Sequence, residues 1–317
     1  MRFKIPACNR ILPFIVIPLM CGCSSQPEHA GDNNSELTLG QARVGYTTRL
    51  TSQTKTPDAV ETPPPDLFEL VTYPDPLGNL PAYVSRAPET GKRFPAIIWL
   101  TGGFSNSIGD TAWAPATPDN DQSASAFRKA GVITMYPSLR GGNNNPGYIE
   151  GFYGEVTDVM AAANYLAKRP DVDPKRIYLG GHSTGGTLAL LIAESSNQFR
   201  AIFSFGPVSD ASNYGSDSVP FDVNDAKECE LRAPIKWLHS IKNPTFVIEG
   251  TEEPGNISEL RLLSNASQNP LIHFIEVPGQ NHFSELAQTT PVVADAIIKD
   301  TALQVNINIS SDQFGKM

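Results

Sequence analysis

The chain has 317 residues, of which 40% are hydrophobic and 18% are charged, a composition typical of a globular protein with a large core. Its formal net charge is −9 at pH 7. Nucleic acids and anionic membrane surfaces are bound through basic faces, so this charge disfavours both as partners.

The first 22 residues have the pattern of an export signal. Three basic residues lie within the first ten positions, and an apolar stretch from 11 to 20 follows them. That stretch contains two prolines and is too short to span a bilayer. It ends in Met-Cys-Gly-Cys at 20–23, which resembles the lipobox of bacterial lipoproteins and implies a lipid on Cys23; Cys21 and a plain secretory signal are the alternatives. We therefore expect an exported protein, periplasmic or surface-facing, that is attached to a membrane through this lipid only.

Polar segments flank the predicted domain on both sides. Residues 23–62 are rich in Ser, Thr, Gln, Asn and Pro, a composition that cannot bury a core and predicts a flexible tether. Beyond residue 301 the chain turns polar again, so residues 302–317 are predicted to be a loose tail. The globular domain is then expected between residues 63 and 301.

Eight apolar runs of strand length lie within this domain. The first two, Leu67–Tyr73 and Leu80–Ser85, alternate like the strands of a hairpin across a turn-rich stretch. The next six are continuous runs, typical of parallel strands that are buried on both faces. They lie at 96–100, 132–136, 177–179, 201–205, 245–248 and 272–277.

Helical segments separate these runs. The clearest is Glu155–Arg169, where apolar residues recur at helical spacing, basic residues lie at the end, and Pro170 stops the helix. Alternating strands and helices predict an α/β domain with a mostly parallel, doubly wound sheet of about eight strands, led by an antiparallel hairpin.

The strand at 177–179 runs into Gly181-His182-Ser183-Thr184-Gly185, and a helix-like segment follows. This is the G-x-S-x-G pattern of a nucleophile elbow, in the strand-turn-helix setting that the pattern requires. Glycines suit the turn because side chains two residues either side of the serine would collide across it. The pattern predicts that Ser183 is a catalytic nucleophile.

From about residue 81 to 300 the chain resembles the catalytic domain of prolyl-oligopeptidase-like and dienelactone-hydrolase-like α/β-hydrolases. The similar stretches, besides the elbow, are LRGG at 139–142, GEVTDV at 154–159 and DVDPKRI at 171–177. The resemblance implies the α/β-hydrolase fold and hydrolysis of an ester or amide through an acyl-enzyme on Ser183, with no cofactor.

A serine hydroxyl needs a base to remove its proton, and the chain has five histidines. His29 lies in the predicted tether, His182 lies within the elbow, and His239 precedes the expected acid, against the order of this fold. His273 lies inside an apolar strand and is the competing candidate. His282 follows the last strand, where the fold places its base, so His282 is the predicted base.

The acid that orients this base is expected in the loop after the strand at 245–248. Three carboxylates compete there, Glu249, Glu252 and Glu253, with Asp210 as a fourth candidate. Glu253 lies where many relatives carry Asp, so it is the preferred prediction.

The oxyanion of the tetrahedral intermediate needs two backbone donors. The expected donors are the amide of Thr184, directly after the nucleophile, and the amide of Gly103 after the third strand. Five aromatic residues on nearby loops are candidates for the walls of an acyl site: Phe104, Trp113, Tyr148, Phe152 and Tyr153.

The residues before the core, about sixty after removal of the signal, are too few for the β-propeller of true prolyl oligopeptidases. An esterase that acts on a small molecule is therefore favoured over a peptidase that acts on a short peptide. A lipoprotein that kept the fold, lost catalysis and only binds its ligand is the rival prediction.

Overall fold

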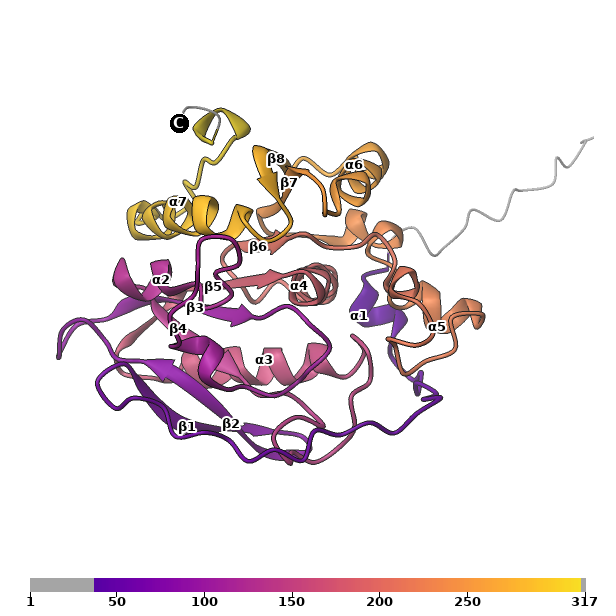
Figure 1. The fold of residues 1–317 in the computed structure, drawn as a ribbon, viewed down its shortest axis with the longest axis horizontal. Helices are drawn as coiled ribbons and strands as arrows, with labels where there is room; N and C mark the ends of the chain where they lie inside the picture. The colour runs from indigo at the N-terminus through magenta and orange to yellow at the C-terminus, as the bar shows by residue number, and fades with distance from the viewer. Residues whose placement is uncertain (1–36, 315–317) are drawn as a thin grey trace, which may run out of the picture. The chain divides into compact units, whose positions relative to one another are not determined.

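The computed structural model describes residues 37–314, in which an eight-stranded sheet forms the centre (Figure 1). The strand order is β1-β2-β4-β3-β5-β6-β7-β8. The strands are β1 Phe68–Asp75, β2 Gly78–Ser85, β3 Phe94–Leu100, β4 Ile133–Pro137, β5 Val172–His182, β6 Ile202–Phe205, β7 Thr245–Glu252 and β8 Ile272–Asn281. Strand β1 pairs antiparallel with β2, and β2 with β4, whereas the pairs from β4 to β8 are all parallel. This is the α/β-hydrolase architecture that the sequence predicts.

Helices cover both faces of the sheet. The α-helices are α1 Leu39–Ala42, α2 Ser125–Lys129, α3 Glu155–Leu166, α4 Thr184–Ser195, α5 Ala226–Glu230, α6 Ile257–Ala266 and α7 Glu285–Lys299. Short 3-10 turns lie at η2 Asp110–Ala112, η3 Ala211–Tyr214, η4 Pro234–Lys236, η5 Leu238–Ser240 and η6 Ser311–Gln313. Apolar side chains of α3, α4 and α6 join one core cluster, and those of α2 and α7 join the other.

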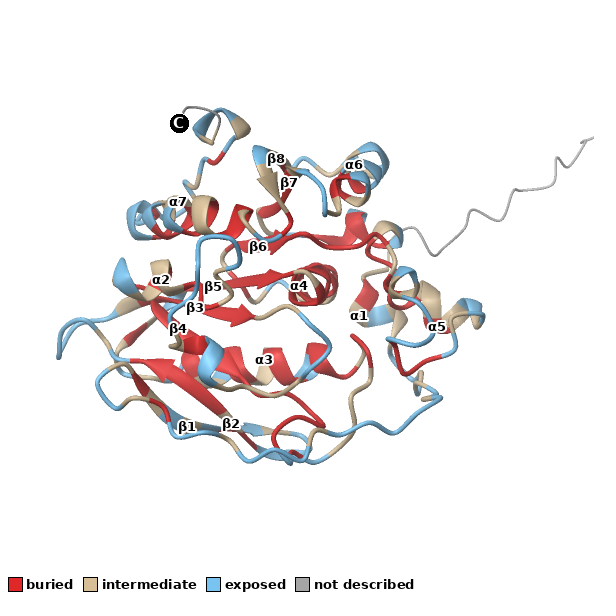
Figure 2. Ribbon diagram, viewed as in Figure 1, coloured by how far each residue is buried: buried red, intermediate tan, exposed pale blue. Residues whose placement is uncertain are grey.

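Strand β3 shows why the predicted strands are continuous apolar runs. Its residues Ile98 and Leu100 belong to one core cluster, while Ile97 and Trp99 belong to the other. Because successive side chains of a strand point to opposite faces, burial on both faces requires apolar residues at every position. Figure 2 shows the strands at the centre of the sheet as buried.

The segment from 37 to 62, predicted as part of a flexible tether, instead packs along the domain. Leu39 has 0% exposure, and the Arg43 guanidinium donates to the carbonyls of Phe152, Tyr153 and Leu231. Between residues 50 and 56 the backbone of this segment forms hydrogen bonds with the rest of the domain at several points. We call residues 37–62 the arm. Its polar composition hides the few contacts that hold it, so the tether prediction is wrong for this part.

The polar tail is also partly ordered. Arg200 donates to the carbonyls of Ala302 and Gln304, and Ile309 is 5% exposed against the cluster that contains α7. The prediction of a loose tail is therefore wrong for residues 302–314. The export signal, Cys21 and Cys23 lie outside the described residues. Within residues 37–314, no helix is long and apolar enough to cross a bilayer.

Candidate active site

Ser183 lies on the turn between β5 and α4. Its backbone has φ 57° and ψ −116°, a conformation that residues other than glycine rarely adopt. The Ser183 amide donates to the Phe205 carbonyl at 2.8 Å, which ties the turn to the end of β6. Such strain is typical of a residue that surrounding structure holds for function.

The elbow glycines are required by close backbone approach. A Cβ on Gly181 would lie 2.3 Å from the Gly185 carbonyl oxygen, and one on Gly185 would lie 2.2 Å from the Leu100 carbonyl oxygen. Both distances are shorter than any ordinary contact, so larger residues would push β5, α4 and β3 apart. The collision across the turn that the sequence predicts is therefore present.

His282 lies just beyond β8 with its ring against Glu249. Its Nδ1 is 3.1 Å from Glu249 Oε2, and the two residues have 7% and 0% exposure. Because a carboxylate only accepts, Nδ1–H is the donor, which leaves Nε2 of a neutral ring free of its proton. This is the tautomer that a general base needs.

The carboxylate beside His282 is that of Glu249, not that of Glu253. Glu253 is exposed and accepts from the Gly255 amide at 2.9 Å, and Glu252 is exposed and accepts from the Thr251 hydroxyl. Asp210 accepts from the Ser212 amide in η3. Strand β7 continues four residues beyond Ile248, so Glu249 lies within the strand and points its side chain toward His282 rather than into a loop.

The end of β6 lies against both Ser183 and His282. Phe205 accepts from the Ser183 amide, and a Cβ on the next residue, Gly206, would lie 2.4 Å from His282 Cε1. The rings of His182 and His282 are 4.5 Å apart. Within residues 37–314, Ser183 Oγ and the His282 ring are not hydrogen-bonded, as is common for catalytic pairs before substrate arrives.

The expected oxyanion donors lie on the two sides of this turn. Thr184 is the first residue of α4, so its amide has no partner inside the helix. Its hydroxyl donates to the Gly103 carbonyl at 2.5 Å, which holds the oxyanion loop, residues 101–104, against the elbow. The Gly102 amide donates to Gln122 Oε1 at 3.2 Å, whereas the described part of the chain offers no acceptor to the Gly103 amide. Gly103, at φ 97°, is therefore the better-placed donor.

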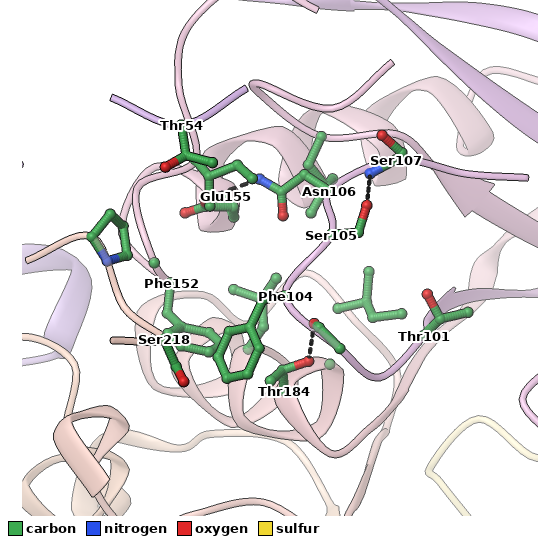
Figure 3. A pocket seen from close by; sticks show the side chains of 18 of the residues that line it. Thr54, Thr101, Phe104, Ser105, Asn106, Ser107, Phe152, Glu155, Thr184 and Ser218 are labelled. Carbon is green, nitrogen blue, oxygen red and sulfur yellow. Dashed lines mark hydrogen bonds between the residues drawn. The ribbon is translucent and has the colours of Figure 1, made fainter. Parts of the chain in front are cut away.

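A cavity of about 490 Å³ opens beside these donors and is lined by both Gly103 and Thr184. In the view of Figure 3, Phe104 and Phe152 lie between Thr184 and the arm residue Thr54. The charged residues among those that line it are Glu155 and Asp217, both carboxylates. The cavity is apolar at its aromatic wall, and no Lys, Arg or His is among the described residues that line it.

The prolyl oligopeptidase family, Peptidase S9, matches residues 118–254, which include the elbow and Glu249. This central part of the chain is similar to the prolyl oligopeptidase family. The chain is 28% identical over 141 residues to the uncharacterized peptidase YuxL of Bacillus subtilis, which covers 39% of this chain and 22% of the relative. The chain spans about a fifth to three fifths of the curated relatives it matches.

Solved structures share the fold of this domain. A puromycin-hydrolyzing peptidase of Mycobacterium tuberculosis has a TM-score of 0.59 at 17% identity, over 76% of this chain and 40% of that one. An esterase of Pyrobaculum calidifontis has a TM-score of 0.52 at 19% identity, over 73% of this chain and 85% of that one. The fold is thus shared with both peptidases and esterases.

Two of the five aromatic residues predicted for the acyl site line the cavity, Phe104 and Phe152. The other three pack elsewhere. Trp113 packs on Tyr83, Tyr148 lies under Lys55, and Tyr153 lies under Arg43.

Sequence reasoning missed Tyr214 and the arm. The Tyr214 ring lies 5.2 Å from that of Phe104 and 5.6 Å from that of Phe152, so it supports the aromatic wall. Thr51, Ser52 and Thr54 of the arm line the cavity. No motif marks these polar residues, because a tether and a cavity wall can share one composition.

The competing histidine lies away from the site. His273, in β8, is paired in register with Phe246 and its ring stacks on that residue at 4.8 Å. His239 is near the arm, where its Nε2 lies 3.2 Å from the Leu37 carbonyl oxygen. Among the described histidines, the two beside the elbow are His182 and His282.

Proposed function

We propose that the protein hydrolyses an ester or amide through an acyl-enzyme on Ser183. The observation that carries this proposal is the buried Glu249–His282 pair, held by β6 beside a strained serine. His282 Nε2 accepts the Ser183 proton as Oγ attacks the substrate carbonyl. The protonated ring then gives that proton to the leaving alkoxide or amine, and the acyl group stays on Oγ.

Deacylation repeats these steps with water as the nucleophile. His282 accepts a proton from water, the hydroxide attacks the acyl carbonyl, and the returned proton restores Ser183. In both halves the amides of Gly103 and Thr184 donate to the oxyanion, and removal of one such donor typically costs 10²–10³-fold in rate. Glu249 stabilises the imidazolium that forms in each half.

The cavity supports a small, uncharged or cationic substrate group. About 490 Å³ is within the range of small-molecule sites, and the aromatic wall of Phe104 and Phe152 suits an apolar acyl group. Because its charged lining residues are Glu155 and Asp217, a substrate anion would be repelled from this cavity.

Esters are the preferred substrates under this proposal, with short peptides as the second candidate. The similarity to the prolyl oligopeptidase family supports the peptidase, and the shared fold with an esterase leaves the ester substrate open. A matched pair, N-acetyl-alanine p-nitrophenyl ester and the corresponding p-nitroanilide, compares the two bonds in one acyl pocket. A kcat/KM for the anilide that equals or exceeds that for the ester would make the peptidase the better assignment.

Labelling with a fluorophosphonate probe tests the nucleophile. We expect the purified protein to be labelled at Ser183 and the Ser183→Ala variant to be unlabelled. Ser195→Ala, a change at the far end of the same helix, is the matched control and should be labelled at the wild-type rate. Folded wild-type protein that resists the probe, and hydrolyses p-nitrophenyl esters no faster than Ser183→Ala, would favour the non-catalytic binding lipoprotein.

We also propose export and a lipid anchor on Cys23, supported by the lipobox-like sequence at 20–23. The Cys23→Ser variant should leave the membrane fraction, while Cys229→Ser should stay with it. If wild type and Cys23→Ser are found in the membrane fraction to the same extent, the proposed lipid anchor on Cys23 is wrong.

A further inference from the structure

His182 and Gln122 link the three parts of the candidate site. The Gly102 amide of the oxyanion loop donates to Gln122 Oε1 at 3.2 Å, and Gln122 Nε2 lies 2.7 Å from His182 Nδ1. His182 Nε2 then lies 2.7 Å from the backbone carbonyl oxygen of His282. One partly buried chain of three hydrogen bonds therefore runs from the oxyanion loop, through the residue before Ser183, to His282.

The chemistry of these groups fixes the direction of every bond. A backbone amide only donates, so the oxygen of Gln122 faces Gly102, and the amide nitrogen faces His182. A second acceptor, Asn120 Oδ1 at 2.8 Å from Gln122 Nε2, holds the same orientation. His182 Nδ1 must then accept, and Nε2–H must donate to the carbonyl of His282.

The surroundings of His182 agree with this neutral tautomer. The ring has 0% exposure, and burial, with a smaller effect of the nearby His282, lowers the pKa of His182 to about 3. A proton on Nδ1 would face the Gln122 NH₂ group, and rotating that amide would break the bond to Gly102. All three hydrogen bonds can therefore form only when His182 is neutral and carries its proton on Nε2.

The missing side chain of Gly102 is part of the same arrangement. A Cβ at Gly102 would lie 3.0 Å from His182 Nδ1 and 3.2 Å from Ser183 Cβ. The oxyanion loop thus lies in direct contact with the elbow, and the Gln122 bond sets which way its next amide, that of Gly103, is presented.

We propose that His182 and Gln122 are positioning residues that fix the Gly103 amide and His282 relative to Ser183. The inference rests on the proposed function and adds to it the residues that keep the donor and the base in register. Neither residue needs to touch substrate. Loss of the chain should lower the rate of the chemical step without weakening substrate binding, because small displacements of reacting groups cost about 10- to 100-fold in rate.

The Gln122→Met variant tests this proposal, since methionine keeps the length of the side chain but cannot bond to Gly102 or His182. We expect kcat for p-nitrophenyl acetate, and the rate constant for fluorophosphonate labelling, to fall about 10- to 100-fold. KM should stay within about twofold, as expected when ground-state binding is retained. Gln198→Met removes a side-chain hydrogen bond to Asn164 outside the site and should keep the wild-type kcat.

Unchanged kcat in Gln122→Met would overturn the proposal. So would a loss of activity that only matches the fraction of protein unfolded, because the role would then be structural. If the methionine variant does not fold, Gln122→Glu has nearly the same shape but places an oxygen toward His182 Nδ1, and the same loss in kcat is expected.

The histidine side-chain nitrogen spectrum gives a second readout that does not depend on activity. At pH 7, His182 in the wild type should be the neutral Nε2–H tautomer; an Nδ1–H tautomer would contradict the network. Failure of wild-type labelling would contradict the proposed function and the positioning role that rests on it, whereas wild-type labelling together with unaltered Gln122→Met kinetics would contradict only the positioning role.

Discussion

Glu249 has no exposed surface, and the partner of its carboxylate within residues 37–314 is His282 Nδ1 at 3.1 Å. Removing a carboxylate from water costs several kcal/mol, and the contact with His282 offsets part of that cost. Glu253, in contrast, lies in solvent and closes a local turn. Burial therefore distinguishes Glu249 from Glu253, although the two residues are only four positions apart.

We predict that Glu249→Gln lowers kcat about 10³- to 10⁴-fold, because the amide cannot hold the required tautomer or stabilise the imidazolium. Glu253→Gln is the matched control and should stay within about twofold of wild type, as a surface change away from the reacting groups. Steady-state kinetics with p-nitrophenyl acetate compares the two variants. If kcat falls further in Glu253→Gln than in Glu249→Gln, the acid is Glu253 and not Glu249.

Helix α4 carries the elbow into the core, and every residue from Thr184 to Glu194 is buried. Glu194, near its end, has 0% exposure, and neither carboxyl oxygen has a hydrogen-bond partner among the described residues. Burial raises the pKa of Glu194 well above its usual range, despite the opposing charge of Arg43. The helix therefore holds a carboxyl group that is protonated in the native protein at pH values where the unfolded chain has lost that proton.

The raised pKa of Glu194 makes the free energy of unfolding depend on pH. Above its ordinary pKa of about 4.5, the unfolded chain binds one proton fewer than the native state, so the free energy of unfolding falls as pH rises. The slope is about 1.4 kcal/mol per pH unit for one proton. Glu194→Gln cannot titrate and should lose this slope, which makes it more stable than wild type at pH 8.

Urea unfolding at pH 5, 6.5 and 8 measures this effect. The exposed residue Glu252 provides the control, since Glu252→Gln should follow the wild-type pH dependence. Parallel curves for Glu194→Gln and wild type would show that Glu194 is ionised in the native protein.

At the scale of the whole molecule, residues of the arm and of the rest of the domain together line the cavity. Arg43 is one anchor of the arm, and it donates to three backbone carbonyls of the domain. Hydrogen bonds to a charged group contribute about 1.5–3 kcal/mol each, so the arm depends strongly on this side chain. The same arm continues to the cavity, where it contributes the lining residues Thr51, Ser52 and Thr54.

We predict that Arg43→Met releases the arm and makes residues 37–62 sensitive to limited proteolysis, while Ser183 remains open to a fluorophosphonate probe. Arg49→Met, at an exposed arm residue, should leave the digestion pattern unchanged. An arm that stays protected in Arg43→Met would show that the other backbone bonds are enough to hold it.

Much of this molecule could be predicted from local sequence. The apolar runs gave all eight strands because burial on both faces demands them, and the glycines around Ser183 marked the elbow because the turn has no room for side chains. His282 could be placed by its position after the last strand. The carboxylate that pairs with His282 could not be predicted. The strand was expected to end at residue 248, whereas β7 continues to Glu252, so Glu249, Glu252 and Glu253 were all assigned to one loop. The packing of the arm and the Gln122–His182 chain depend on contacts between distant residues, which carry no local pattern.

Trapping the acyl-enzyme tests the central claim most directly. The wild-type protein is mixed with p-nitrophenyl pivalate, whose bulky acyl group slows deacylation, then quenched in acid and mapped by peptide mass spectrometry. We predict one pivaloyl group on Ser183, released with the same rate constant as steady-state turnover. Turnover without an acyl group on Ser183, or with the acyl group on another residue, would contradict the account.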